Sequence, residues 1–307
     1  MKVLIVGGTG FVGARLSQHL SLSHDVHVTT RKPLANFKKT IVGDATDSSF
    51  FAKLASQSFD AVVYTVSLNH SESNQDIERT IEVNVNSTGK CLEAFSKSQA
   101  KRFIYFSTQQ VYGPFTAGFD FNEDSACNPN NIYGLTHLMS ESLCNYYFNN
   151  TKLKSIAVRL SNSVGAPIIS SPHISSLVAL DLCQMCVREG VIKLKSDGTP
   201  QRDFIAMGDV CKGVETLLTI PKPNYSIYNL GSGQTITLGE LAVQIARIYE
   251  NLSGKKTKIL RNDGIEITSQ TIFNDKRFSY STSRLGELGF RAKTSIEAAL
   301  TEILKGV

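Results

Sequence analysis

The glycines near the amino terminus have the spacing to hold a phosphate group. The run KVLIV at 2–6 leads directly into GGTGFVG, which sets glycines at positions 7, 10 and 13, and an amphipathic stretch follows at once. Glycine permits a tight turn, lets backbone N–H groups approach a pyrophosphate at the positive end of a helix, and lets helix and strand pack closely. The motif predicts a dinucleotide site formed by Gly7, Gly10, Phe11, Val12 and Gly13. The alternative is a glycine-rich turn without a ligand.

The end of the second expected strand bears on which dinucleotide binds. A carboxylate there would bond the ribose 2′-hydroxyl of NAD, whereas an arginine accommodates the 2′-phosphate of NADP. The sequence reads VTTRKP at 28–33, so Arg31 and Lys32 supply positive charge and no acid is present. We therefore expect NADP, with NAD as the alternative cofactor. A solvated basic turn is the other explanation of these two charges.

Further cofactor contacts are expected where the next strands end. Asp44, in VGDATD, can accept a hydrogen bond from an adenine amino group, whereas Asp47 is better placed to cap the following helix. Ala45, Thr65 and Val66 complete the expected cofactor site.

Alternating strands and helices must position these residues. Short apolar runs, rich in β-branched residues, alternate with amphipathic stretches that include one long stretch at about 75–99 and another at about 133–148. The expected strands lie at 2–6, 25–30, 40–45, 60–66, 102–108 and 155–161. Strands that are apolar on both faces belong to a parallel sheet covered by helices on both sides. The pattern predicts an α/β fold with a doubly wound parallel (Rossmann) sheet.

The regular alternation decays after about residue 164. Helices are expected at 174–189, 208–219 and 237–251, and a strand near 191–194. We expect a dinucleotide-binding Rossmann domain over 1–165, with 208–232 returning to it. Residues 166–207 and 233–307 are expected to form a smaller C-terminal α/β substrate domain.

Composition excludes several classes of function. The net charge of +5 is spread along the chain and forms no basic block, so we expect no nucleic acid partner. No apolar run approaches the ~18 to 20 residues that a membrane helix needs, and no secretory signal is apparent, so we expect a cytoplasmic protein without a membrane partner. The six cysteines are interpreted as reduced buried thiols. The Cys183–Cys186 pair lacks a second pair or a nearby histidine, and we predict no metal site.

Several motifs together resemble one family over essentially the whole chain. They are GGTGFVG, VNVNSTGKCLEAF, FSTQQVYG, YGLTHLMSE, RLSNSVGAP, TPQRDFIAMGDV, YNLGSG and ELGF. In order and spacing they resemble the extended short-chain dehydrogenase/reductase family, the NAD(P)-dependent nucleotide-sugar epimerases, dehydratases and ketoreductases. Several motifs in one order are far more specific than any one of them.

The resemblance implies a reacting group of Thr108, Tyr133 and His137. In the family, the tyrosine exchanges a proton with a sugar oxygen, the Ser or Thr bonds that oxygen, and a lysine holds ribose hydroxyls and lowers the tyrosine pKa. Here His137 fills the lysine position. Asn84 matches the helix asparagine that helps organise the site; a buried amide bonded to backbone is its structural alternative.

The replacement of lysine favours reduction over oxidation. Histidine is mostly neutral at pH 7, so the tyrosinate that an epimerase or alcohol oxidase needs is harder to form, whereas a ketoreductase needs the protonated phenol. The acid and base of the family's 4,6-dehydratases are replaced by Gln109 and Gln110, which disfavours dehydration. The resulting hypothesis is an NADPH-dependent ketoreductase. An epimerase with retained NAD and a non-catalytic dinucleotide-binding sensor remain the alternatives.

Family resemblance also implies the substrate contacts. Asn162 and Arg202, with Arg277 as a further candidate, would bind the diphosphate of a nucleotide-sugar substrate. The resemblance implies a homodimer formed through helices at about 83–98 and 133–148. Asp209 is expected to cap the helix that follows it.

Overall fold

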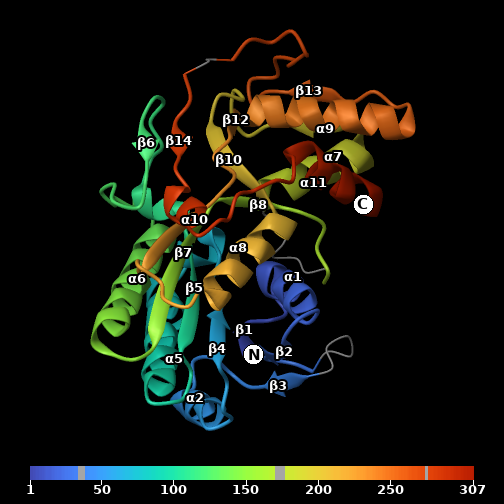
Figure 1. Ribbon diagram of the computed structural model, residues 1–307. Helices are drawn as coiled ribbons and strands as arrows, with labels where there is room; N and C mark the ends of the chain where they lie inside the picture. The colour runs from blue at the N-terminus through green and yellow to red at the C-terminus, as the bar shows by residue number, and fades with distance from the viewer. Residues whose placement is uncertain (34–38, 170–176, 274–275) are drawn as a thin grey trace.

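A parallel sheet of seven strands forms the centre of the molecule (Figure 1). The computed structural model describes residues 1–33, 39–169, 177–273 and 276–307. The order across the sheet is β11-β7-β5-β4-β1-β2-β3. Strands β2 and β3 are added on one side of β1 and the later strands on the other, so the strand order reverses between β1 and β4. The strands are β1 (Lys2–Val6), β2 (Asp25–Thr30), β3 (Thr40–Val42), β4 (Ala61–Tyr64), β5 (Arg102–Thr108), β7 (Lys154–Leu160) and β11 (Ile227–Leu230). This is the doubly wound topology that the sequence predicted.

Helices cover both faces of the sheet because its strands are apolar on both sides. In β1, Val3 and Ile5 enter the core under α1 (Phe11–Leu20) and α8 (Met207–Thr219). The alternate residues, Leu4 and Val6, enter the opposite core. That second core lies under α2 (Ser48–Ala55), α5 (Ser87–Ser96) and α6 (Ile132–Asn150), as Figure 1 shows. The carboxyl ends of the strands are therefore held in place by a packed layer of helices on each face of the sheet.

The segment after β4, which includes the long amphipathic stretch expected at about 75–99, is divided into several helices. It contains α3 (His70–Ser73), α4 (Ile77–Thr80) and a π-helix, η1 (Ile81–Asn86), before α5 begins. Asp76 caps α4 by accepting a hydrogen bond from the Arg79 N–H, which starts a new helix at that point. The wider π turn lies where the buried Asn84 side chain bonds two other segments.

The remaining elements gather beyond the carboxyl edge of the sheet (Figure 1). Three small sheets are formed by β8 (Asn162–Val164), β10 (Gln201–Ala206) and β12 (Thr235–Thr237), by β9 (Val191–Lys193) and β13 (Lys258–Leu260), and by β6 (Asp120–Phe121) and β14 (Ser279–Tyr280). The helices are η2 (a 3-10 helix, Gln109–Tyr112), α7 (Val178–Glu189), α9 (Leu238–Ser253), α10 (Ser283–Glu287) and α11 (Ile296–Gly306). Helices α7, α9 and α11 share a separate apolar core.

Residues 207–230 return from this region to the central sheet, where α8 packs against α1 and β11 pairs with β7. The first residues of the helix expected at 174–189 lie outside the described residues. Asp209 does not cap α8 as expected: it lies in the first turn, and its carboxylate accepts hydrogen bonds from the N–H groups of Lys293 and Thr294. Within the described ranges, no helix combines the length and the apolar character needed to cross a membrane.

Candidate active site

The turn between β1 and α1 has room only for glycine at its critical positions. Gly7 adopts a φ of +83°, and a Cβ at Gly13 would lie 2.4 Å from the Gly7 carbonyl oxygen. No side chain caps α1 at Gly10. The first N–H groups of the helix are therefore left for a ligand, and the positive end of the helix dipole favours an anion there.

A cavity of about 840 Å³ opens above this turn, at the carboxyl ends of the central strands. Its wall contains thirteen of the residues that the sequence predicted for the site: Gly7, Gly10, Phe11, Val12, Gly13, Arg31, Asp44, Ala45, Thr65, Val66, Thr108, Tyr133 and Asn162. The expected cofactor and catalytic ends thus share one continuous space. A crevice at a topological switch point is the usual ligand site of such sheets.

Arg31 and Asp44 both line the cavity, on the loops that follow β2 and β3. Lys32 does not line the cavity; it is exposed, and its backbone N–H bonds the Thr30 hydroxyl. The Thr46 N–H and hydroxyl both donate to the Asp44 carboxylate. These bonds, with a smaller effect from the Arg31 charge, hold the pKa of Asp44 below its usual value. Asp47 caps α2, as expected.

At the expected catalytic end, Thr108 and Tyr133 meet from two elements. Thr108 ends β5 and caps η2, and Tyr133 lies in the first turn of α6, whose start is fixed by the Asn131 side chain. Burial raises the pKa of Tyr133 to about 12, and hydrogen bonding to Thr108 opposes part of that rise. The phenol therefore keeps its proton throughout the physiological pH range.

His137 lies one helical turn after Tyr133, behind it rather than on the cavity wall. Its ring centroid is 4.5 Å from that of Tyr133, and only 2% of the residue is exposed. Nδ1 makes a 2.8 Å hydrogen bond with the Tyr105 hydroxyl, while Nε2 has no hydrogen-bond partner among the described residues. Burial lowers the pKa of His137 to about 3, so the imidazole is neutral. The position expected for a lysine thus carries no charge.

Asn84 is fully buried and does not line the cavity either. Its Oδ1 accepts a hydrogen bond from the Leu68 N–H, and its Nδ2 donates to the Thr136 hydroxyl. The side chain therefore ties the segment after β4, which does line the cavity, to the helix that carries Tyr133. Asn84 therefore helps to position the site without lining the cavity itself.

The cavity wall also contains residues that the sequence analysis missed. Ser107, Gln110 and Phe204 line its catalytic and distal parts, and Arg79 lines it from α4. Tyr105 was missed as well, although the alternation of β5 places its side chain on the α6 face of the sheet. That period-two pattern was the available signal.

The expected substrate residues occupy the distal edge. Asn162 pairs with Phe204 across β8 and β10, and its amide donates to the Asp203 carbonyl. Arg202 is outside the cavity lining, on the same face of β10 as Phe204. It is half-buried, it donates a hydrogen bond to the Gln201 carbonyl, and burial lowers its pKa. A half-buried cation of this kind suits an anionic ligand.

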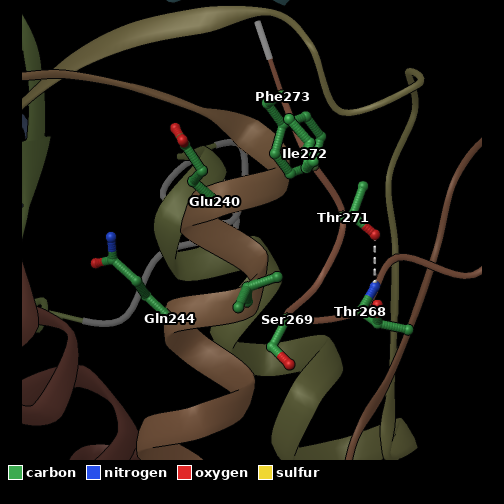
Figure 2. Close-up of a pocket in the computed structure, with 8 residues that line it drawn as sticks. Glu240, Gln244, Thr268, Ser269, Thr271, Ile272 and Phe273 are labelled. Atoms are coloured by element: carbon green, nitrogen blue, oxygen red, sulfur yellow. Dashed lines mark hydrogen bonds between the residues drawn. The ribbon is translucent and has the colours of Figure 1, made fainter. Parts of the chain in front are cut away.

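Arg277 lies next to this edge but already has a carboxylate partner. The Gln201 side chain bonds the backbone on both sides of Arg277, which docks that segment on β10. The Arg277 guanidinium donates to Glu240 at 2.6 Å. Glu240 and Gln244 of α9 also border a smaller cavity of about 340 Å³, closed by residues 268–273 (Figure 2). Among the described residues that line this second cavity, Glu240 is the single ionisable side chain.

Metal binding finds no support in the part of the chain that the structure describes. It contains no cluster of three or more His, Cys, Asp or Glu side chains that could hold an ion, and all six cysteines are free.

Comparison with known proteins identifies the family. Residues 3–231 match the family model for the NAD dependent epimerase/dehydratase family. The chain is 24% identical over 324 residues to dTDP-D-glucose 4,6-dehydratase from Mus musculus, covering 99% of this chain and 88% of that protein.

Solved structures show the same fold. UDP-glucuronic acid 4-epimerase from Bacillus cereus, in complex with UDP-glucuronic acid and NAD, matches with a TM-score of 0.82 and 21% identity over 100% of both chains. RMD from Pseudomonas aeruginosa complexed with NADPH matches with a TM-score of 0.78 and 23% identity, over 99% of this chain and 98% of the other. Because the family model covers most of the sequence, the chain belongs to the NAD dependent epimerase/dehydratase family and is an enzyme of that family.

Proposed function

We propose that the protein reduces a keto group on a nucleotide-diphosphate sugar, with NADPH as the hydride donor. The observation that carries this proposal is the state of Tyr133: a phenol whose pKa burial raises to about 12, with the neutral ring of His137 beside it. Such a phenol is a proton donor. It is poorly suited to act as the base that starts an oxidation.

The residues of the cavity fit a nicotinamide dinucleotide. The Gly7–Gly13 turn and the uncapped start of α1 would hold the pyrophosphate, and Asp44 and Ala45 would face the adenine. The two structural relatives carry NAD in one case and NADPH in the other, so similarity alone does not choose between them. Arg31 on the cavity wall, after a strand that ends without an acid, favours NADP.

In the proposed reaction, Thr108 and Tyr133 bond the keto oxygen of the substrate. When bound, the cofactor supplies the hydride that reduces the keto carbon. Tyr133 transfers its phenolic proton to the oxygen as the negative charge develops there, so the product is an alcohol. Solvent then restores the proton to Tyr133.

Asn162 and Arg202 are proposed to bind the diphosphate of the substrate, with Arg277 as a weaker candidate because Glu240 already engages it. We propose that residues 166–207 and 233–307 act as the substrate domain, and that 208–232 serves the dinucleotide domain through its place in the central sheet.

Epimerisation with retained NAD is the second candidate, since an epimerase is among the structural relatives. It requires a tyrosinate at the start of the cycle. Ionising a phenol with a pKa of about 12 at pH 7 costs about 7 kcal/mol, which disfavours this route.

Dehydration is a further reaction to consider, because the mouse relative is a 4,6-dehydratase. In this chain, Gln109 and Gln110 replace the acid and base that the family's dehydratases use.

A homodimer through α5 and α6 remains part of the proposal. On α6, Leu135, Met139 and Tyr146 leave 43%, 40% and 59% of their surface exposed. These apolar side chains follow helical spacing on the outer face, where a second copy would cover them.

The experiment that tests the function is NADPH oxidation in the presence of nucleotide-linked 4-keto sugars. We expect turnover by the parent protein and a loss of about 10²- to 10⁴-fold in the Tyr133→Phe variant, because the proton donor is removed. A Tyr133→Phe variant as active as the parent would refute every catalytic role proposed here.

A further inference from the structure

Three rings follow one another from the cavity wall into the core. Tyr133 lines the cavity, and the His137 ring meets it edge-on at 4.5 Å with an interplanar angle of 66°. His137 in turn lies 5.7 Å from the ring of Tyr105 and shares the 2.8 Å hydrogen bond with its hydroxyl. Tyr105 comes from the middle of β5 and is 1% exposed. Strand β5 of the central sheet thus contacts the reactive tyrosine indirectly, through the imidazole of His137.

We propose that Tyr105 is a positioning residue for Tyr133: it donates its hydroxyl proton to Nδ1 of His137 and so holds that ring, as the Nε2–H tautomer, against Tyr133. The inference rests on the proposed function in one respect only, namely that Tyr133 is the proton donor of the reaction.

The hydrogen-bond pattern around Tyr105 supports this direction of donation. The Tyr105 phenol is buried, which raises its pKa well above the usual value, so its oxygen keeps a proton that needs an acceptor. The neighbouring Ser140 hydroxyl donates its own proton to the Asn84 carbonyl oxygen, so it does not donate that proton to Tyr105. Nδ1 of His137 lies 2.8 Å from the Tyr105 hydroxyl, and we infer that its lone pair is the acceptor. A neutral imidazole that accepts at Nδ1 carries its proton on Nε2.

The charged groups nearest to His137 do not compete for this role. Glu141, one turn further along α6, bonds Arg159 through both carboxylate oxygens and also accepts from the Ser107 hydroxyl. That carboxylate is therefore engaged on the β5 and β7 side. His137 is left with the Tyr105 hydroxyl at 2.8 Å and the Phe106 backbone, whose hydrogen bonding raises the pKa of His137 slightly against the larger effect of burial.

The arrangement explains how a site without the lysine keeps its tyrosine in place. A lysine would be held by its charge, whereas an uncharged imidazole is free to rotate about its side-chain bonds unless one nitrogen is anchored. With Tyr105 as the anchor, the His137 ring packs against Tyr133, and the Tyr133 phenol also has the hydrogen bonding to Thr108 that opposes part of the rise in its pKa. Loss of the Tyr105 hydrogen bond should let the Tyr133 phenol adopt several positions without changing the cofactor cavity.

The test uses ¹⁵N-histidine NMR on the full-length protein, with His137→Gln to assign the signal. In the parent protein we expect His137 to carry its proton on Nε2 and to show no titration from about pH 6 to about pH 9. The tautomer is read on the parent protein, the variant serves only for assignment, and no knowledge of the substrate is needed, so the measurement stands even if the reductase proposal fails.

The kinetic arm compares Tyr105→Phe with Tyr64→Phe. Tyr64 is a matched control because it is also fully buried, lies on the neighbouring strand and bonds Ser87 rather than His137. For Tyr105→Phe we expect a mixture of His137 tautomers in the spectrum. We also expect its kcat to be about tenfold lower at an unchanged KM for NADPH, which corresponds to the loss of one hydrogen bond. Tyr64→Phe should keep the spectrum and the kcat of the parent protein.

Two results would overturn the proposal. One is a parent protein with the His137 proton on Nδ1. The other is an equal loss of kcat in the Tyr105→Phe and Tyr64→Phe variants, which would reduce the role of Tyr105 to general packing.

Discussion

Replacing His137 by lysine should lower the pKa of Tyr133 by a predictable amount. The two rings lie 4.5 Å apart, and a unit charge at that distance in an effective dielectric near 20 is worth about 3.7 kcal/mol, or about 2.7 pK units. The cost of burying an ammonium group makes this an upper value. The pKa of Tyr133 should therefore fall from about 12 toward about 9.

The sign of the functional effect follows from which form of tyrosine each reaction needs. At pH 7 the tyrosinate fraction rises by up to about 500-fold, so oxidation or epimerisation should become faster by up to that factor. Reduction uses the phenol and should be unchanged near pH 7, falling only above about pH 9 in the variant.

The assay is an absorbance titration of tyrosinate in His137→Lys, from which the same titration of His137→Lys/Tyr133→Phe is subtracted. His137→Gln is the control, since it removes the imidazole without adding charge. A Tyr133 pKa that moves by less than about half a unit in His137→Lys would refute the electrostatic reasoning.

Three further outcomes are expected. Arg31→Ser should reduce the preference for NADPH over NADH by about 10- to 100-fold, seen as the ratio of the two dissociation constants, because a charge-assisted bond to the 2′-phosphate is lost. Glu141→Gln should lower the free energy of unfolding by about 3–5 kcal/mol in a denaturant titration, since it leaves the buried Arg159 uncompensated. Glu93→Gln, which breaks an exposed pair, is the control and should leave the free energy of unfolding almost unchanged. Met139→Lys should shift sedimentation from dimer to monomer without loss of fold, and an unchanged dimer would place the interface elsewhere.

The sheet and the phosphate turn were predictable because local patterns determine them. The apolar runs of β1 and β5, buried on both faces, indicate a parallel sheet, and the spacing of Gly7, Gly10 and Gly13 indicates the turn. The motifs that resemble the family placed Thr108, Tyr133 and Asn162 in one cavity although they are far apart in the sequence.

Contacts between distant segments were not predictable in this way. The break at Asp76 and the π turn around Asn84 depend on bonds to Leu68 and Thr136, which no local periodicity reveals. The pairing of Arg277 with Glu240 likewise depends on how two separate segments meet.

His137 shows the same limit at the catalytic end. Its position one turn after Tyr133 was evident from the sequence, and so was its lack of charge at neutral pH. Its withdrawal from the cavity wall and its bond to Tyr105 follow from the packing of α6 on β5, which the sequence alone does not report.

The central claim, an NADPH-dependent reductase, is tested most directly by denaturing the purified protein and identifying the released small molecules by mass spectrometry. We expect NADP(H), or an empty site that then binds NADPH in preference to NADH. Stoichiometric, tightly held NAD would contradict the claim and support the epimerase, and an empty site that binds both cofactors equally would support a sensor instead.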